Sequence, residues 1–165
     1  PTRGLIGYQS ELLTDTRGTA IMNRLFHSYA PYKGAIQGRR NGVLISNSDG
    51  EAVAYALFNL EDRGPMMIEP QTRVYQGMIV GEHTRENDLE VNVLKGKKLS
   101  NVRAAGKDEN IILTPPIKMP LEKALSYIQE DELVEVTPQS IRLRKRWLDP
   151  NERKKAERRR AEEVA

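Results

Sequence analysis

Two stretches of the sequence carry cations at spacings suited to binding a polyanion. The first, KGKKLSNVRAAGKDEN (residues 95–110), holds five Lys or Arg residues and no acidic residue before Asp108. The second, residues 142–160, holds ten Lys or Arg against three acidic residues. The whole chain has a formal net charge of only +3, so the rest of it is net acidic. Concentrated cations on an acidic body favour a bound polyanion, such as a nucleic-acid backbone, and the alternative is simple solvated charge.

The first stretch has the composition of a loop rather than of a core element. Its only sizeable apolar side chains are Leu99 and Val102, while the flanking segments LEVNVL and IILTPP are typical of buried strands. Lys and Arg can neutralise phosphates, and the small residues of AAG allow close approach of the backbone. The sequence therefore predicts a cationic loop that extends from the body and can bind a phosphate backbone.

The sequence offers little for catalysis. Without cysteine there is no thiol catalysis, disulfide or Cys-ligated metal, which fits a reducing compartment. AAGKDE lacks the upstream glycine of a phosphate-binding loop and has an acid where that loop needs Ser or Thr. The two histidines, His27 and His83, lack triad partners and metal-ligand spacing. We therefore expect a binding module without a metal site; the alternative is a hydrolase that uses His83 with Glu82 or Asp88.

The elements that position these groups begin with a helix and a strand. TRGLIGYQSELLTDTRG (residues 2–18) predicts a helix that ends at Gly18, and TAIMNRLFHSYAPY (residues 19–32) predicts a strand. The apolar residues of the helix share one face: Leu5, Ile6, Leu12 and Leu13. One helix and one strand form half of an α/β plait and cannot bury an apolar face alone, so we expect a further segment to cover it.

The middle of the chain predicts short strands and one helix. A Gly-rich linker is expected at residues 32–42. GVLIS and EAVAYALF flank the turn sequence NSDG and predict a hairpin whose second arm drifts toward helix. Further strands are expected at MMIE, RVYQG, MIVGEH, LEVNVL and NIILT. PLEKALSYIQED (residues 120–131) has apolar residues at i, i+3, i+4 and i+7, which predicts an amphipathic helix beginning at Pro120.

The C-terminal cations fall on a predicted strand, after the strand LVEVT. Alternation along SIRLRKRWL predicts a row of guanidinium groups about 6–7 Å apart. These are Arg142, Arg144 and Arg146. The opposite, apolar side carries Ile141, Leu143 and Trp147. The row could bind RNA, or it could be an exposed face kept soluble by arginine.

A basic tail follows this strand. DPNERKKAERRRAEEVA opens with a capping box in which Asp149 is the N-cap, Pro150 the first helical residue and Glu152 the third. The tail has no apolar stripe. It is therefore expected to be a solvated helix or an arm that becomes ordered on RNA.

Three long stretches resemble one family. PTRGLIGYQSELLTDTRGTAIMNRLFHSYAPYKG resembles the end of the domain V equivalent, shared with elongation factor G, in the BipA/TypA family of translational GTPases. VGEHTRENDLEVNVLKGKKLSNVRAAGKDENIILTPP resembles the C-terminal domain found only in that family. EDELVEVTPQSIRLRKRWLDPNERKKAERR resembles the family's C-terminus, so the resemblance covers essentially the whole chain.

The resemblance implies an α+β fold in three parts. Residues 1–34 would be the end of a ferredoxin-like unit similar to domain V of elongation factor G. Residues 35–148 would form a mixed, β-rich C-terminal domain with one amphipathic helix, and residues 149–165 a basic helical or disordered tail. The GTPase domain of the family, with its GTP and magnesium, has no counterpart in these residues. We therefore expect no cofactor and no enzymatic activity in this chain.

The resemblance also implies a function in the cytoplasm, with no membrane contact. Members of the family bind the bacterial ribosome, hydrolyse GTP there, and are linked to large-subunit assembly and to growth under stress. Their C-terminal domain reaches the A site, where its loop contacts transfer RNA and ribosomal RNA. The expected partners are therefore large-subunit ribosomal RNA, A-site transfer RNA and the remaining N-terminal domains. The alternative is a generic nucleic-acid-binding module without ribosome specificity.

The expected RNA contacts lie in the loop and on the last strand. In the loop they are Lys95, Lys97, Lys98, Asn101, Arg103 and Lys107. On the strand they are Arg142, Arg144, Lys145 and Arg146.

Overall fold

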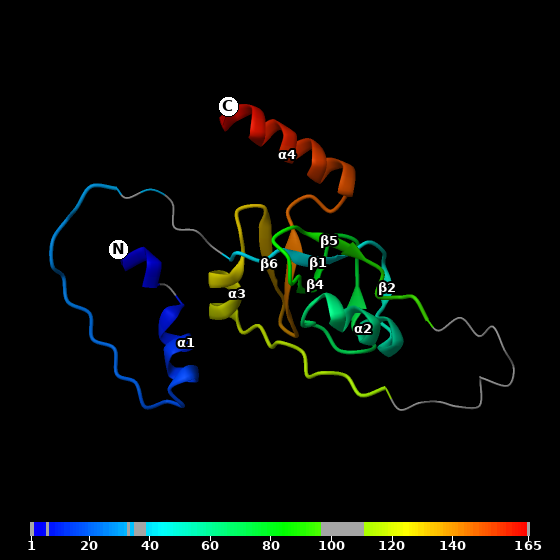
Figure 1. Ribbon diagram of the computed structural model, residues 1–165, viewed down its shortest axis with the longest axis horizontal. Helices are drawn as coiled ribbons and strands as arrows, with labels where there is room; N and C mark the ends of the chain where they lie inside the picture. Colours follow the sequence, from blue (N-terminus) through cyan, green and yellow to red (C-terminus); the bar gives the residue numbers. More distant parts are fainter. Residues whose placement is uncertain (1, 6, 33, 35–38, 97–110, 165) are drawn as a thin grey trace, which may run out of the picture.

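The computed structural model describes residues 2–5, 7–32, 34, 39–96 and 111–164, and it shows an α+β protein (Figure 1). The fold class is therefore as predicted. In chain order the elements are η1 (Thr2–Leu5), α1 (Tyr8–Asp15), β1 (Val43–Ser46), β2 (Gly50–Glu51), α2 (Ala54–Leu60), η2 (Glu61–Arg63), β3 (Arg73–Val74), β4 (Ile79–Glu82), β5 (Leu89–Val91), α3 (Leu121–Tyr127), β6 (Glu132–Val136), β7 (Ile141–Lys145) and α4 (Pro150–Val164).

A three-stranded sheet in the order β4-β1-β5 forms the centre of the body. The middle strand β1 pairs antiparallel with β4 and parallel with β5, and all four of its residues are buried. Leu44 packs into one core, with Leu57 of α2. Val43 and Ile45 pack into a second core on the opposite face, which includes residues of α3 and β7. Because both faces are covered, β1 reads as an unbroken apolar run rather than an alternating one.

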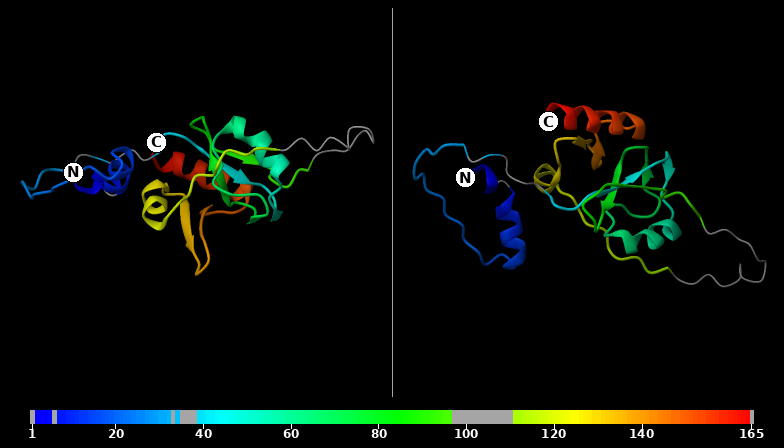
Figure 2. Two further views of the ribbon diagram at one scale, coloured as in Figure 1. Left: turned by 90° about the horizontal axis from the view of Figure 1, so that it is seen from below. Right: turned by 45° about the horizontal axis from the view of Figure 1, so that its top comes forward.

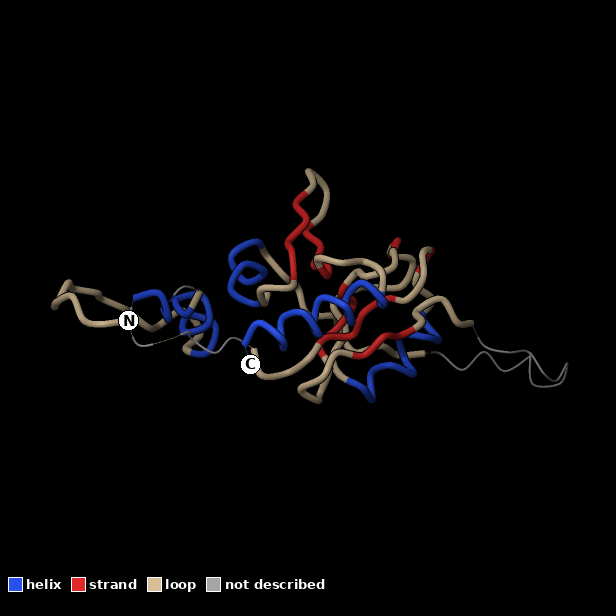
Figure 3. Tube along the Cα trace, turned by 90° about the horizontal axis from the view of Figure 1, so that it is seen from above, coloured by secondary structure: helices blue, strands red, loops and turns tan. Residues whose placement is uncertain are grey.

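A hairpin of β6 and β7 is joined to this sheet at one end. The two strands pair antiparallel from Glu132↔Lys145 to Val136↔Ile141. An isolated bridge connects Met78 to Arg144, and the backbone N–H of Lys145 donates to the carbonyl of Gly77 at 2.9 Å. Figure 3 shows the far end of the hairpin standing out from the rest of the body. The hairpin is thus fixed at the end where β6 begins and β7 ends.

Two predicted helices form where their signals place them. α3 begins directly after Pro120 and buries Ala124. Asp149 caps α4, since its Oδ1 accepts hydrogen bonds from the backbone N–H groups of Asn151 (2.7 Å) and Glu152 (3.1 Å). Figure 2 shows α4 lying along one side of the body. Within the described residues, no helix combines the length and the apolar character needed to cross a membrane.

The helix predicted over residues 2–18 is not continuous in the structure. Gly7 adopts the left-handed φ of 79° and separates η1 from α1. A Cβ on Gly7 would lie 2.6 Å from the Cβ of Ser126, so the break also allows close approach to α3. Ile6 lies outside the described residues, and Leu5 belongs to η1 rather than to the helix of Leu12 and Leu13.

The predicted strand over residues 19–32 is absent from the structure. This segment runs as a loop at the left of Figure 1, with Leu25 94% and Tyr29 95% exposed. A strand needs a partner for its backbone groups, and none of the described segments pairs with this one. Nor does any residue of η1 or α1 become buried.

The predicted hairpin around NSDG is also wrong in its pairing. β1 pairs with β4 and β5, while β2 pairs with β3. Pairing on both edges buries β1 completely, which a two-stranded hairpin could not do. The strand predicted at NIILT is also wrong over its described residues, 111–114, which form no strand. There the N–H of Thr114 donates to the Glu61 carboxylate at 2.7 Å.

Candidate nucleic-acid interface

The structure fixes the two ends of the cationic loop. Before it, Val93 is buried and its carbonyl accepts from the N–H of Val53, which precedes α2. After it, Thr114 is held by Glu61 of η2. Both ends therefore lie on the α2 side of the body (Figure 1). The anchored ends show from which side of the body the loop starts.

Of the six predicted contacts in the loop, the structure places one. Lys95 is exposed beside the buried end of the preceding segment. The other five lie outside the described residues: Lys97, Lys98, Asn101, Arg103 and Lys107. Their RNA contacts stay predictions.

The arginines of β7 share one face with residues of β6. Arg142 lies opposite Glu135, 3.8 Å from its carboxylate, and Arg144 lies opposite Leu133. Glu135 also accepts a hydrogen bond from Tyr75, and burial together with this bond raises the pKa of the Tyr75 hydroxyl. One of the two arginines on this face, Arg142, is thus partly held by a neighbouring carboxylate.

Beyond the end of β7 the alternation is lost. Arg146 is exposed and its guanidinium lies 5.4 Å from the centre of the Trp147 ring. Ile141 and Leu143 pack in or against the second core, as alternation predicts. Trp147 does not join them and remains 36% exposed, because the strand ends at Lys145.

Lys145 corrects the predicted set of RNA contacts. It is only 1% exposed, since alternation places it on the same side as Leu143. Its Nζ lies 2.6 Å from Asp88, 2.7 Å from Asp131 and 2.9 Å from Glu132. A lysine held by three carboxylates inside the protein is not available to a phosphate, so Lys145 is a structural residue here.

Lys145 belongs to a larger buried charge network. Arg39, in the segment before β1, binds both carboxylate oxygens of Glu132 at 2.7 and 3.1 Å. Its guanidinium also stacks 4.5 Å from the centre of the Tyr127 ring, at the end of α3. The Glu132 side chain is fully buried. The network thus connects the segment before β1 to α3, β6 and β7. Sequence patterns did not predict this connection.

The charges of the network shift one another's pKa values. Burial alone would raise the pKa of Glu132, but the hydrogen bonds from Arg39 and the charge of Lys145 outweigh it, so the pKa is lowered. Burial alone would lower the pKa of Lys145, but the charge of Glu132 and the bonds to Asp131 and Asp88 outweigh it, so that pKa is raised. Glu132 and Lys145 therefore stay ionised across the neutral range.

The free energy of unfolding is expected to fall in acid through Glu132. A lowered folded-state pKa means that the stabilisation is present above the ordinary value of 4.5 and is lost as pH falls through the folded value. Lys145 acts at the other end, since its contribution is present below 10.5 and is lost as pH rises through the raised value. Urea unfolding measured from neutral pH downward should show the loss below 4.5.

The matched variant for this measurement is Glu132→Gln. It should be less stable at neutral pH and should lose less on acidification than the parent chain does. Glu86→Gln, at an exposed carboxylate, should follow the parent curve. Equal acid dependence in the parent and in Glu132→Gln would contradict the assignment.

The three residues of the hydrolase alternative make structural contacts with other parts of the chain. The buried His83 places Nδ1 2.5 Å from the carbonyl of Asn87. Glu82 accepts hydrogen bonds from Asn41 and Tyr127. Asp88 accepts from the N–H of Val43 at 2.9 Å, besides its ion pair with Lys145. In the part of the chain that the structure describes, no three His, Cys, Asp or Glu side chains gather as a metal site would require.

Two family models match the chain. Residues 41–150 match the TypA/BipA C-terminal domain, and residues 1–40 match the elongation factor G C-terminus. Both matches are to C-terminal domains, so these residues do not include the GTPase domain of the family.

Several curated proteins are similar over nearly all of the chain. The large ribosomal subunit assembly factor BipA of Salmonella typhimurium is 55% identical over 164 residues, which is 99% of this chain and 27% of that protein. Its counterpart of the same name in Haemophilus influenzae is 54% identical over 159 residues, or 96% and 26%. That of Buchnera aphidicola is 57% identical over 158 residues, or 95% and 26%. The chain thus spans about a quarter of the length of the relatives it matches.

Proposed function

The chain belongs to the TypA/BipA family, and on that premise we propose that it is the ribosome-binding C-terminal region of a translational GTPase. The region positions the protein on RNA, while GTP and magnesium belong to domains that these residues do not include. Its partners are large-subunit ribosomal RNA, A-site transfer RNA and the protein's remaining domains. It works in the cytoplasm, in ribosome assembly and in translation under stress.

The observation that carries the proposal is the cationic loop between two anchored ends. Five cations follow one another without an acid between Lys95 and Lys107, and the chain on both sides is fixed to α2 and η2. A stretch of this composition can neutralise successive phosphates. The relatives are named for large-subunit assembly, which makes ribosomal RNA the polyanion that fits best.

A second set of cations supports the same role. Arg142 and Arg144 lie on one face of the hairpin, although Arg142 is partly paired with Glu135, and the exposed Arg146 follows the end of β7. Lys145 is not part of this set. We propose that the arginines add phosphate contacts to those of the loop.

The exposed apolar side chains of residues 8–32 fit the same picture. Tyr8, Leu13 and Phe26 are 43%, 38% and 75% exposed, and α1 buries none of its residues. We propose that the rest of the elongation factor G-like domain, in the preceding part of the full protein, covers them.

Co-sedimentation of this chain with bacterial ribosomes in a salt series tests the proposal. We expect binding that weakens steeply between about 50 and 200 mM salt, because each neutralised phosphate releases counterions. Duplex DNA at matched salt is the control and should bind more weakly. No ribosome binding at low salt would contradict the proposal, and equal affinity for DNA would favour the generic nucleic-acid-binding module.

A further inference from the structure

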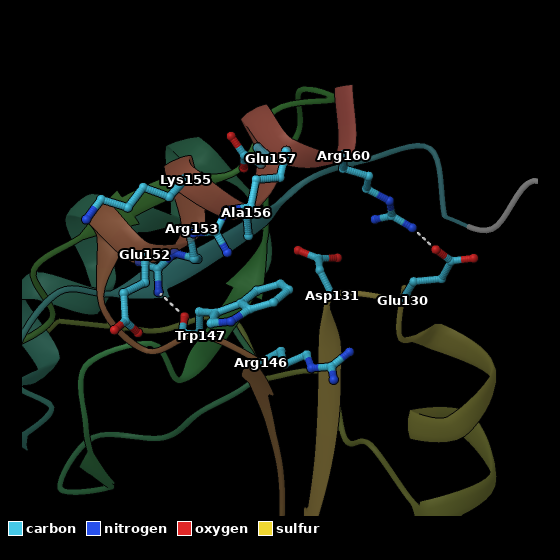
Figure 4. Close-up of a pocket in the computed structure, with 11 residues that line it drawn as sticks. Glu130, Asp131, Arg146, Trp147, Glu152, Arg153, Lys155, Ala156, Glu157 and Arg160 are labelled. Carbon is cyan, nitrogen blue, oxygen red and sulfur yellow. Dashed lines mark hydrogen bonds and ion pairs between the residues drawn. The ribbon is translucent and has the colours of Figure 1, made fainter. Parts of the chain in front are cut away.

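A cleft of about 680 Å³ lies between α4 and the base of the β6–β7 hairpin. Its volume falls within the range of small-ligand sites. One aromatic ring, that of Trp147, lies in it among cations and carboxylates (Figure 4). The cations that line it are Arg146, Arg153, Lys155, Arg159 and Arg160.

The position of Trp147 in this cleft is fixed by its backbone. Arg153 of α4 donates from Nη1 to the carbonyls of Trp147 (2.8 Å) and Leu148 (2.7 Å), and its other end pairs with Glu90. Arg153 is itself only 8% exposed. A buried arginine therefore holds the half-exposed indole at the cleft and fastens the first turn of α4 over it.

Two of the carboxylates that line the cleft already have partners. Glu130 pairs with Arg160, and Asp131 pairs with Lys145. Figure 4 shows the carboxylates of Glu152 and Glu157 directed away from the Trp147 ring. The charge left for a ligand at the ring is therefore positive.

Three lining cations have no ion pair in the described part of the chain. Arg146 lies against the indole, and Lys155 and Arg159 extend from α4 with exposed side chains. An aromatic face bordered by cations suits a nucleotide, because the base can stack while the phosphate is neutralised. An acidic peptide would use the cations but would leave the ring without a partner.

We propose that this cleft binds one unpaired nucleotide of an RNA strand. Its base stacks on Trp147, and Arg146, Lys155 and Arg159 neutralise the adjoining phosphates. The inference rests on the proposed function, since it makes the cleft a second RNA contact beside the loop. It also gives α4 a role that its lack of an apolar stripe left open.

Trp147 is the only tryptophan of the chain, so its fluorescence reports on the cleft directly. We expect a single-stranded adenylate hexamer to quench it as the base stacks. Trp147→Leu should weaken binding of the fluorescently labelled hexamer, read by anisotropy, by about 5- to 150-fold. Circular dichroism of this variant shows that the fold is kept.

Two neighbouring arginines of α4 give the matched pair of variants. Arg159→Glu should weaken hexamer binding by about tenfold, whereas Arg158→Glu, at a residue that does not line the cleft, should change it less than about twofold. A duplex RNA of the same length should not quench Trp147. Equal effects of the two variants would overturn the inference, as would hexamer binding without quenching or no binding at all.

Failure of this inference can be told apart from failure of the proposed function. If ribosomes still co-sediment with the chain but the hexamer does not quench Trp147, the cleft is not an RNA site and the proposed function stands. If the hexamer quenches Trp147 but ribosomes do not bind, the ribosomal source of the strand is wrong.

Discussion

Replacing Lys145 by Met is expected to lower the free energy of unfolding by about 3–5 kcal/mol, the cost of removing one partner from a buried ion pair. Among the described residues, the change would leave the fully buried Glu132 with Arg39 as its only close cation, while Asp88 and Asp131 lose their common partner. Met nearly matches the length and volume of the lysine stem, so lost packing contributes little. Urea unfolding followed by circular dichroism gives the difference.

The same measurement distinguishes the structural role from an RNA contact. Lys155→Met, at an exposed position on α4, should change the unfolding free energy by no more than about 0.5 kcal/mol. If Lys145→Met were equally harmless to stability but weakened ribosome binding, the buried network would be wrong and the original sequence prediction right.

Reversing the charge of Lys97, Lys98 and Arg103 together is expected to weaken ribosome binding by roughly 10²- to 10³-fold at low salt. Each change removes a neutralised phosphate and puts a like charge in its place, which costs several kcal/mol in total. The dependence of the affinity on salt should become shallower, because fewer counterions are released. Co-sedimentation of the variant beside the parent chain across the salt series measures both effects.

The control for this variant reverses the same number of charges elsewhere. Arg63, Arg73 and Arg85 are exposed and lie outside the loop, so their reversal to Glu should cost far less affinity at equal net charge. Equal losses in the two triple variants would mean that net charge, rather than the loop, governs the affinity. Unchanged affinity in the loop variant would remove the loop from the interface.

Local signals in the sequence predicted where α3 and α4 begin, although α2 was expected as the second arm of a hairpin. α3 begins after Pro120, and Asp149 caps α4, because these signals act between residues a few positions apart. The pairing of β1 could not be predicted in this way. Its parallel partner β5 lies 45 residues further on, and the turn sequence NSDG favoured the nearer, wrong partner.

The candidate site, too, was predicted only where local sequence signals sufficed. The clusters of basic residues led to the prediction that the loop and the β7 arginines bind RNA. The same reasoning included Lys145, which has the same charge as the arginines but is buried. The alternation rule contained the correction, since it places Lys145 on the side of Ile141 and Leu143. The acids Asp131 and Glu132 at the start of β6 were a second signal. No sequence signal pointed to Arg39 or Asp88 as members of the network, because their partners lie far away in the sequence.

The buried network also sets the order in which this domain can be completed during synthesis. Arg39 and Asp88 leave the ribosome before their partners Glu132 and Lys145 do, because they precede them in the sequence. Until then β1 has one face open, since Leu143 of its second core is also still missing. The nascent domain therefore carries unpaired ions and an exposed sheet face until β7 has emerged. Its folding can finish only after β7 has left a ribosome, the same kind of particle that we propose the mature protein binds.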